Sequence, residues 1–390
     1  MRSGLEIGAA ASATIPALFL RALDIHLDPQ AEAVIYGVAI VGAAFLLIWG
    51  VETAELRMPQ ALALAILAVV AVLPEYAVDL YFAWSAGKDP EYAPYTIANM
   101  TGANRLLIGI GWPLIVFLGW LKGRQREVRM ESAQRVELSF LIWATLYSFI
   151  IPLKGSLSLV DAFILILLFF LYIRKSSKGE VVVPKLSGPS KAIASLPPGR
   201  RNICTLLLFL FPAGIILASA SRFADGLIDT GSVLGVDEFI MVQWIAPLAS
   251  ETPEILAASI IAIRGMGGTG LGVLISSKVN QWTLLVGTLP LVYCLSLGEI
   301  GSLPLDSRQA EEVFLTSAQS AFALVLLSRL GFSLKGAGII FILFSTQLFF
   351  TATEVRLGYA IAYLALAVLL LARSPGRARG VFDIARDIFR

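Results

Sequence analysis

Charged side chains are scarce in this sequence, and their scarcity sets the class of the protein. Asp, Glu, Lys and Arg make up 15% of the 390 residues, whereas a soluble domain carries about 25%. Hydrophobic residues make up 57%, and they gather in repeated runs of about 20 residues, the length that crosses a bilayer as a helix. The composition therefore indicates a polytopic helical membrane protein.

Histidine, cysteine and nucleotide-binding motifs are also nearly missing. The single histidine, His26, excludes a multi-histidine metal site and histidine-based catalysis. The two cysteines, Cys204 and Cys294, lie in apolar segments without metal-type spacing, so we interpret them as core residues. The glycines between 265 and 272 permit a tight turn, because no Gly-Lys-Ser/Thr follows them. We expect no enzyme, no ATP-driven pump and no cofactor, and we expect neither nucleic acid nor nucleotide as a partner.

Twelve apolar segments are predicted to cross the membrane as helices. They lie at about 5–23, 32–50, 60–84, 94–121, 136–152, 157–173, 203–221, 238–263, 269–297, 313–330, 336–353 and 357–373. The first segment fits a retained helix better than a signal peptide, because Arg2 alone supplies the positive start. The tail from Val381 to Arg390 has a helical apolar stripe, which suits either the inner membrane surface or a short solvated helix.

The positions of the basic residues give an orientation. Lys and Arg cluster after the fourth segment, in the polar stretch 174–201 and after 373, whereas other loops are acidic and include Asp225, Asp229 and Asp237. Because basic loops remain cytoplasmic, twelve crossings put every strongly basic loop and both termini on the inner side. The sequence thus predicts an integral protein of a bacterial or archaeal inner membrane, in contact with the lipid bilayer.

Two proline-broken helices carry carboxyl groups at membrane depth. The first reads Val72-Leu-Pro-Glu75-Tyr-Ala-Val-Asp79, and the second reads Glu251-Thr-Pro-Glu254. Glu75 and Asp79 are four residues apart and Glu251 and Glu254 are three apart, so each pair shares a helix face. A charge in hydrocarbon costs about 2.5–3.5 kcal/mol, and such residues mark ion or substrate pathways. A helix proline also frees a carbonyl oxygen four residues earlier, which is a hard ligand suited to a small cation.

The helix after each acidic helix contains a polar break. The breaks are Asn99-Met-Thr-Gly-Ala-Asn104 and Ser276-Ser-Lys278-Val-Asn-Gln281. The amides of Asn99 and Asn104 are candidate cation ligands, or alternatively interhelical hydrogen-bond partners. Lys278 either neutralises part of the carboxylate charge or snorkels to the cytoplasmic surface and pairs with lipid.

This duplicated order of motifs resembles the calcium/cation antiporter superfamily, which includes the sodium/calcium exchangers. The family has two inverted repeats, each with a Gly-Thr-Ser-x-Pro-Glu helix followed by a Gly-Asn-x-x-Gly-Ser-Asn helix. The matching stretches are Pro74-Glu75, Pro253-Glu254 and Asn99-x-x-Gly102-Ala103-Asn104.

The second repeat departs from the family pattern at three positions that bear on ion binding. Glu251 replaces a serine of the first motif, and Val273 and Lys278 replace the two asparagines of the second motif. Lys278 is therefore expected to reduce the number of bound ions.

The resemblance implies an all-α bundle of two inverted five-helix repeats, that is, a ten-helix core with an extra helix at each end. The corresponding division is an extra N-terminal helix and turn (1–31), the first repeat (32–174), a cytoplasmic loop (175–201), the second repeat (202–353), and an extra C-terminal helix with a basic amphipathic tail (354–390). It also implies an antiporter that exchanges calcium for sodium or protons by alternating access. Glu75 and Glu254 would then be metal ligands at a carboxylate site near the midplane.

Other functions are compatible with the same residues. The altered second repeat also suits a scaffold or ion sensor that binds a cation without moving it. Asp79 and Asp161 are a candidate carboxylate pair for a membrane-embedded hydrolase, although no motif supports that function. Glu75 and Glu254 alternatively form structural ion pairs in the bundle.

Overall fold

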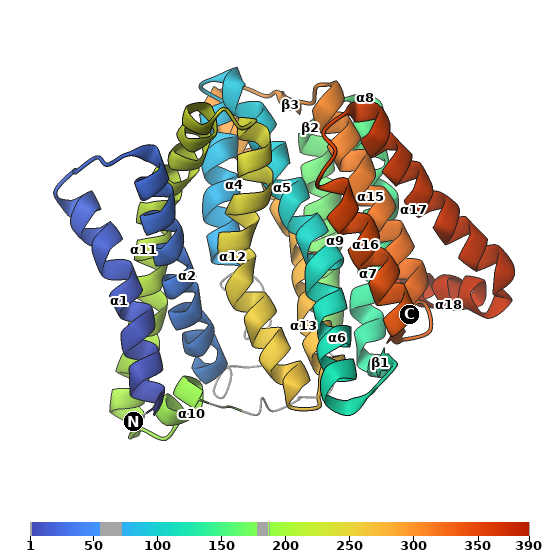
Figure 1. The fold of residues 1–390 in the computed structure, drawn as a ribbon, viewed down its shortest axis with the longest axis horizontal. Coiled ribbons are helices and arrows are strands. Elements are labelled where there is room, and N and C mark those ends of the chain that lie inside the picture. Colours follow the sequence, from blue (N-terminus) through green and yellow to red (C-terminus); the bar gives the residue numbers. More distant parts are fainter. Residues whose placement is uncertain (1, 55–71, 178–185, 187, 390) are drawn as a thin grey trace. The chain divides into compact units, whose positions relative to one another are not determined.

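The structure is a computed structural model that describes residues 2–54, 72–177, 186 and 188–389. It is built almost entirely of helices (Figure 1). The α-helices are α1 (Arg2–Ala22), α2 (Pro29–Ala54), α4 (Leu73–Ala86), α5 (Ala93–Leu106), α6 (Trp112–Gly123), α7 (Arg135–Ser148), α8 (Ile150–Lys154), α9 (Leu159–Ser176), α10 (Gly188–Ala194), α11 (Pro198–Leu234), α12 (Glu238–Ile263), α13 (Gly267–Asn280), α14 (Val286–Leu297), α15 (Ser307–Leu327), α16 (Leu334–Gln347), α17 (Thr353–Arg373) and α18 (Pro375–Arg386).

Short elements connect these helices. The 3₁₀-helices are η1 (Pro90–Tyr92), η3 (Ser132–Gln134) and η5 (Asp387–Phe389), and the π-helices are η2 (Leu107–Gly111) and η4 (Gln281–Leu285). The strands are β1 (Glu127–Arg129), β2 (Ser156–Ser158), β3 (Ser302–Pro304) and β4 (Gly331–Ser333).

The helices confirm an all-α membrane protein. Within the described ranges, eight helical segments are long and apolar enough to cross a membrane. The shorter α9 and α16 lie where the sequence predicts segments 157–173 and 336–353, and α13, η4 and α14 together fill 269–297. The segment predicted at 60–84 and the loop after 174 lie partly outside the described residues.

Helix α11 is longer than predicted. It continues to Leu234 instead of ending near 221, so the prediction that Asp225 and Asp229 lie in an acidic loop is wrong. The added turns are amphipathic rather than wholly apolar, and a hydropathy criterion therefore ends the segment too early. The helix stops where Gly235 adopts a left-handed conformation with φ 65°, which glycine tolerates and other residues disfavour.

Helix α12 passes through both of its prolines without interruption. Pro247 and Pro253 lie inside one continuous helix, so the expected break in this helix is wrong. A proline still removes one backbone donor. Nearby hydroxyls bond backbone carbonyls of the same helix: Ser250 bonds the Ala246 oxygen at 3.3 Å, and Thr252 bonds the Leu248 oxygen.

The chain forms two compact units. The first contains Met1–Phe82 and Ile173–Pro253, and the second contains Ala83–Tyr172 and Glu254–Arg390. In the first unit α2 packs against both α1 and α11. The contact with α1 is close because Gly42 lacks a side chain; a Cβ there would lie 2.6 Å from the Ala10 carbonyl oxygen.

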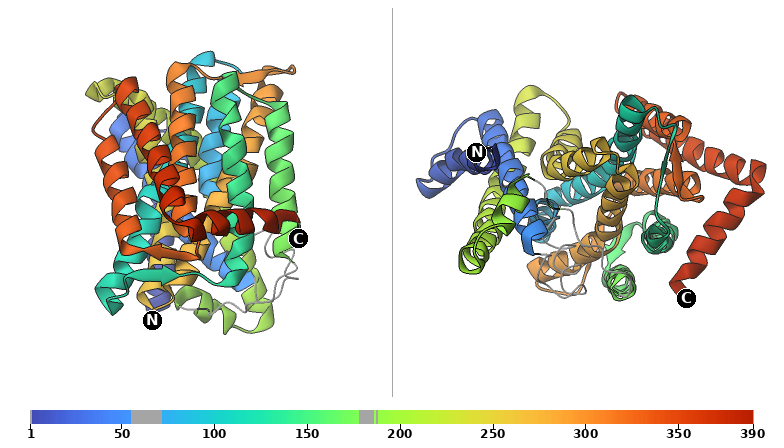
Figure 2. Two further views of the ribbon diagram at one scale, coloured as in Figure 1. Left: turned by 90° about the vertical axis from the view of Figure 1, so that its right-hand side faces the viewer. Right: turned by 90° about the horizontal axis from the view of Figure 1, so that it is seen from below.

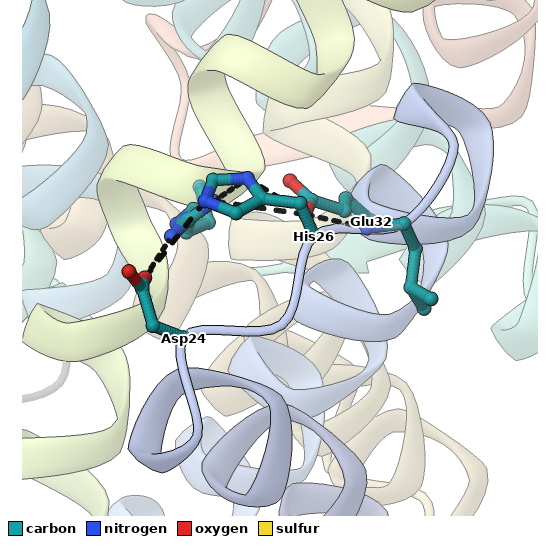
Figure 3. A network of polar contacts seen from close by, with 5 residues as sticks. Asp24, His26 and Glu32 are labelled. Carbon is teal, nitrogen blue, oxygen red and sulfur yellow. Dashed lines mark hydrogen bonds and ion pairs between the residues drawn. The ribbon is translucent and has the colours of Figure 1, made fainter.

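A polar network attaches the turn between α1 and α2 to α11 (Figure 3). Arg222 of α11 lies 2.8 Å from the Asp24 carboxylate and also contacts the His26 ring. The Leu27 N–H donates to the Glu32 carboxylate at 3.1 Å. His26 thus helps to hold a turn, and in the described part of the chain no group of three or more His, Cys, Asp or Glu side chains is arranged to hold a metal ion.

Two short antiparallel strand pairs in the second unit show that the repeats are inverted. β1 pairs with β4, and β2 pairs with β3. β1 and β3 each follow the third helix of a repeat, whereas β2 and β4 each precede the fifth. In each pair, a strand between the third and fourth helices of one repeat therefore pairs with a strand between the fourth and fifth helices of the other repeat. Because successive connections lie at opposite ends of a helical bundle, the two repeats run in opposite directions.

The C-terminal tail is helical, as predicted, and it docks on the second unit. In Figure 2 α18 runs crosswise to the long helices of this unit. Asp387 forms an ion pair with Arg135 of α7 at 2.7 Å, and the Trp143 ring N–H donates to the Ala385 carbonyl oxygen at 3.0 Å. Arg377 donates to carbonyl oxygens at the end of α15, where a cation stabilises a helix.

Candidate cation-binding site

Two carboxyl groups meet inside the first unit, one from each acidic helix. Glu75 of α4 and Glu251 of α12 are both 1% exposed. The Glu75 carboxyl group accepts a hydrogen bond from the Ser250 hydroxyl, and the Glu251 side chain is its neighbour. Two carboxyl groups bond to one another only when one of them holds a proton, because an ionised carboxylate has no donor. This pair is therefore suited to hold either a proton or a cation.

Helix α4 carries a third carboxyl group into the interior of the same unit. Asp79 lies one helical turn beyond Glu75 and is 0% exposed. Two residues further on, the Tyr81 hydroxyl donates to the Asp225 carboxylate of α11, at 2.7 Å from each oxygen. This contact between α4 and α11 fixes the helix that presents Glu75 and Asp79.

The second unit holds Glu254 against α13. The Ser277 hydroxyl of α13 donates to the half-buried Glu254 carboxylate at 2.7 Å. The two helices approach closely because position 270 is glycine: a Cβ on Gly270 would lie 2.6 Å from the Ala258 carbonyl oxygen of α12. The glycines predicted to form a turn thus have two roles, since Gly265 adopts φ 88° in the turn and Gly270 permits helix packing.

Lys278 and Asn104 are in direct contact in the second unit. The Lys278 ammonium donates to the Asn104 side-chain oxygen at 2.6 Å and to its backbone carbonyl oxygen at 3.4 Å. The ammonium also lies 4.2 Å from the centre of the Trp282 ring, a favourable cation–π distance. Lys278 is 0% exposed, so the alternative that it snorkels to the membrane surface is wrong.

Both asparagines of the first polar break are buried on α5. Asn99 and Asn104 are each 0% exposed. The Asn104 amide N–H donates to the Met100 carbonyl oxygen at 2.8 Å, which directs the amide oxygen toward Lys278. Asn104 therefore forms the interhelical hydrogen bond that was one of the two alternatives for it.

Each polar break leads into a π-helix. η2 begins at Leu107, three residues after Asn104, and η4 begins at Gln281, three residues after Lys278. π-Helical turns are rare and often occur at functional sites. Their equivalent positions add structural evidence for the repeat, and the sequence contains no short motif that predicts them.

Asp161 has a structural role at the start of α9. Its carboxylate accepts hydrogen bonds from the Ser158 backbone N–H at 2.6 Å, from the Ser158 hydroxyl at 2.7 Å and from the Tyr147 hydroxyl at 2.6 Å. It also pairs with Lys154. A carboxylate with four donors holds the helix start in place and is poorly suited to act as the hydrolytic group considered above.

The predicted site residues thus form two groups. Glu75, Asp79 and Glu251 lie in the first unit, and Asn99, Asn104, Glu254 and Lys278 lie in the second. That both groups contribute to one midplane site stays a prediction. The hydroxyls of Ser250 and Ser277 are carboxylate partners that were not among the predicted site residues. Both stand at hydroxyl positions of the family motifs, so the motifs contained the signal.

Comparisons with known proteins agree with this architecture. The family model described as sodium/calcium exchanger protein matches residues 33–176 and 204–374, one range on each side of the central loop. The crystal structure of the H⁺/Ca²⁺ exchanger CAX is 43% identical to this chain, covers 100% of it and 98% of its own length, and superposes with a TM-score of 0.96. A comparison with curated proteins found no match.

More distant structures share the fold alone. Native YfkE is 15% identical, with a TM-score of 0.61 over 94% of this chain and 100% of its own. The sodium-calcium exchanger NCX_Mj is 17% identical, with a TM-score of 0.54 over 83% of this chain and 99% of its own. From the family match and the 43% identity over the full length, the chain belongs to the sodium/calcium exchanger family of the calcium/cation antiporter superfamily.

Proposed function

We propose that this protein is a secondary active antiporter that exchanges Ca²⁺ for protons by alternating access. The burial of the neighbouring Glu75 and Glu251 carboxyl groups carries the proposal, because two carboxyl groups kept out of water beside one another need a proton or a cation to offset their charge. The relative at 43% identity is described as an H⁺/Ca²⁺ exchanger, which supports the same two ions.

The carboxyl groups would couple the two fluxes through their charge. Ca²⁺ binds six to eight oxygen atoms, and carboxylates, hydroxyls and backbone carbonyls all supply such oxygens. When Ca²⁺ reaches Glu75 and Glu251, a proton held by this pair leaves. A site that is neither protonated nor loaded keeps several bare charges in hydrocarbon, which is unfavourable. Only the protonated or the Ca²⁺-loaded protein then changes the side to which its site opens.

The basic loops place both termini on the cytoplasmic side in this proposal. Protons that enter along their gradient would then drive Ca²⁺ out of the cell. Sodium is the competing counter-ion, and a scaffold that binds Ca²⁺ without moving it is the competing function.

Reconstituted transport tests the proposal. Purified protein in proteoliposomes should accumulate radioactive Ca²⁺ when the lumen is acidic, and collapse of the pH gradient with a protonophore and a potassium ionophore should stop the uptake. Glu75→Gln and Glu254→Gln should each abolish it. Glu299→Gln removes an equal charge from an exposed loop position and should transport normally. Saturable Ca²⁺ binding without uptake on any gradient would identify the scaffold instead.

A further inference from the structure

The interior of the second unit contains an ammonium group that the family motif does not have. Lys278 stands where the second motif of the family carries an asparagine, and its side chain is 0% exposed. Eleven residues separate it from Gly267 at the start of α13, which is about 16 Å along a helix that rises 1.5 Å per residue. Helix α13 continues through η4 into α14, so the charge lies far from either end of this helical run.

The surroundings of this ammonium are built to hold a cation. Two oxygens of Asn104 accept hydrogen bonds from it, and the face of Trp282 lies 4.2 Å away. An amide oxygen and a backbone carbonyl oxygen are also the kind of neutral oxygen ligands that bind a small metal cation. The Asn104 amide is locked in this direction by its bond to the Met100 carbonyl oxygen. The Lys278 ammonium therefore occupies ligands that a free monovalent cation would otherwise take.

A lysine cation differs from a bound ion in one respect that matters for transport. It brings one positive charge into the site but cannot leave with the transported ions. It would therefore compensate carboxylate charge in every state of the cycle, while a dissociable ion compensates it only when bound.

We propose that Lys278 acts as a tethered cation that occupies the Asn104 oxygens and thereby excludes Na⁺ from this antiporter. This inference rests on the proposed antiport function, and it identifies the residue that selects protons over sodium as counter-ion. Glu254, which Ser277 holds on the adjacent position of α13, is the carboxylate whose charge the tethered cation would offset.

Restoring the family residue gives the direct test. In proteoliposomes, an outward Na⁺ gradient should not change the Ca²⁺ uptake of the wild-type protein. Lys278→Asn should gain Na⁺-driven Ca²⁺ uptake, raised about tenfold above the wild-type level, a typical size for a coupling effect. Lys278→Met should allow Na⁺ to bind to the vacated Asn104 oxygens, measured as radioactive Na⁺ bound to protein in detergent. Lys335→Asn, which changes an exposed lysine at the start of α16, should leave Na⁺ without effect.

A double variant distinguishes Na⁺ binding to the Asn104 oxygens from an effect of removing the Lys278 charge alone. If Na⁺ takes the place of the ammonium, Lys278→Asn combined with Asn104→Ala should lose the Na⁺-driven uptake that Lys278→Asn gains. Both variants are first checked for folding by elution as a single peak in gel filtration. The proposal is overturned if a folded Lys278→Asn variant shows no Na⁺-driven uptake, or if a folded Lys278→Met variant binds no Na⁺. If Lys278→Asn does not fold, the measurement of Na⁺ binding by Lys278→Met decides the question. If neither variant folds, the proposal is contradicted, because the Lys278 charge is then needed for folding rather than for ion selectivity.

The two proposals fail in different ways. If wild-type protein takes up no Ca²⁺ on any gradient, the antiport function is wrong. If wild-type protein takes up Ca²⁺ on a Na⁺ gradient, antiport stands and the role of Lys278 is wrong.

Discussion

Replacing Glu312 with glutamine should destabilise the second unit severely. Glu312 of α15 lies between two arginines: one of its oxygens is 2.6 Å from the Arg105 guanidinium of α5, and the other pairs with Arg356 of α17. The Arg105 and Glu312 side chains are 0% exposed, and the Arg356 side chain is 5% exposed. One carboxylate thus balances two cations from two other helices, and neutralising it leaves both without that partner in a dry interior.

The loss of stability in Glu312→Gln depends on the two arginine charges that remain buried. Removal of one partner from a buried ion pair costs about 3–5 kcal/mol, mostly because the remaining charge is uncompensated. Two arginines lose the same carboxylate here, so we expect the upper end, about 5 kcal/mol. At roughly 1.4 kcal/mol per factor of ten, this lowers the ratio of folded to unfolded protein by between three and four powers of ten.

Unfolding in mixed micelles provides the measurement. The loss of helical circular dichroism is followed as the fraction of sodium dodecyl sulfate rises, and the midpoints of the variants are compared. Glu354→Gln is the matched control, because it makes the same chemical change at an exposed position of α17 and should cost less than about 0.5 kcal/mol. Equal midpoints for Glu312→Gln and Glu354→Gln would refute the reasoning.

A triple substitution tests the cause of the instability. Replacing Arg105 and Arg356 with methionine and Glu312 with leucine removes all three charges and keeps similar volumes. Buried ion pairs exchanged for apolar side chains in this way are often neutral or stabilising. We therefore expect the triple variant to recover most of the stability that Glu312→Gln loses, and a triple variant as unstable as the single one would show that the pairing itself is favourable.

Three further predictions concern packing and the helix ends. Gly270→Leu should lower the free energy of unfolding by about 1–3 kcal/mol and weaken Ca²⁺ uptake, because its Cβ would clash with a carbonyl oxygen of α12. The control Gly214→Leu on α11, where a Cβ would have nothing within 4 Å, should change neither quantity. Asp161→Asn should lower the free energy of unfolding by about 0.5–2 kcal/mol, as for loss of a helix cap, and it should keep Ca²⁺ exchange, whereas loss of exchange in folded protein would contradict its structural role. Asp387→Asn should release α18 from Arg135 of α7, seen as faster trypsin cleavage in the tail, and an unchanged digestion pattern would show that other contacts hold α18.

The positions of the membrane helices could be predicted because each must bury its backbone in hydrocarbon. That requirement imposes a long apolar run for each crossing, and the observed helices match the predicted runs closely. The prediction failed at the end of α11, where the helix leaves the strongly apolar region and continues with polar residues on one face. Helical hydrogen bonding does not need an apolar environment, so hydropathy alone cannot detect such an extension.

The motifs located the acidic residues, but their partners depend on packing between distant segments. Glu75 and Ser250 are 175 positions apart in the chain, and no local pattern predicts that a hydroxyl of α12 reaches a carboxyl group of α4. Lys278 illustrates the same limit. A lysine in an apolar segment is compatible with snorkelling or with burial, and the outcome depends on whether neighbouring helices supply oxygens, which Asn104 does.

The contact between Lys278 and Asn104 also fixes where the symmetry of the repeats is broken. The two residues occupy the same motif position, and in a molecule with two inverted repeats, equivalent residues touch only where they lie next to the pseudo-two-fold axis. Two asparagines at this place would present their oxygens symmetrically to one cation between them. Because the second repeat has lysine instead, one repeat supplies the ligands and the other supplies the cation, within 2.6 Å. A single substitution next to the axis thus changes the charge at the contact between the two repeats, whereas the same substitution elsewhere in a repeat would alter only one repeat.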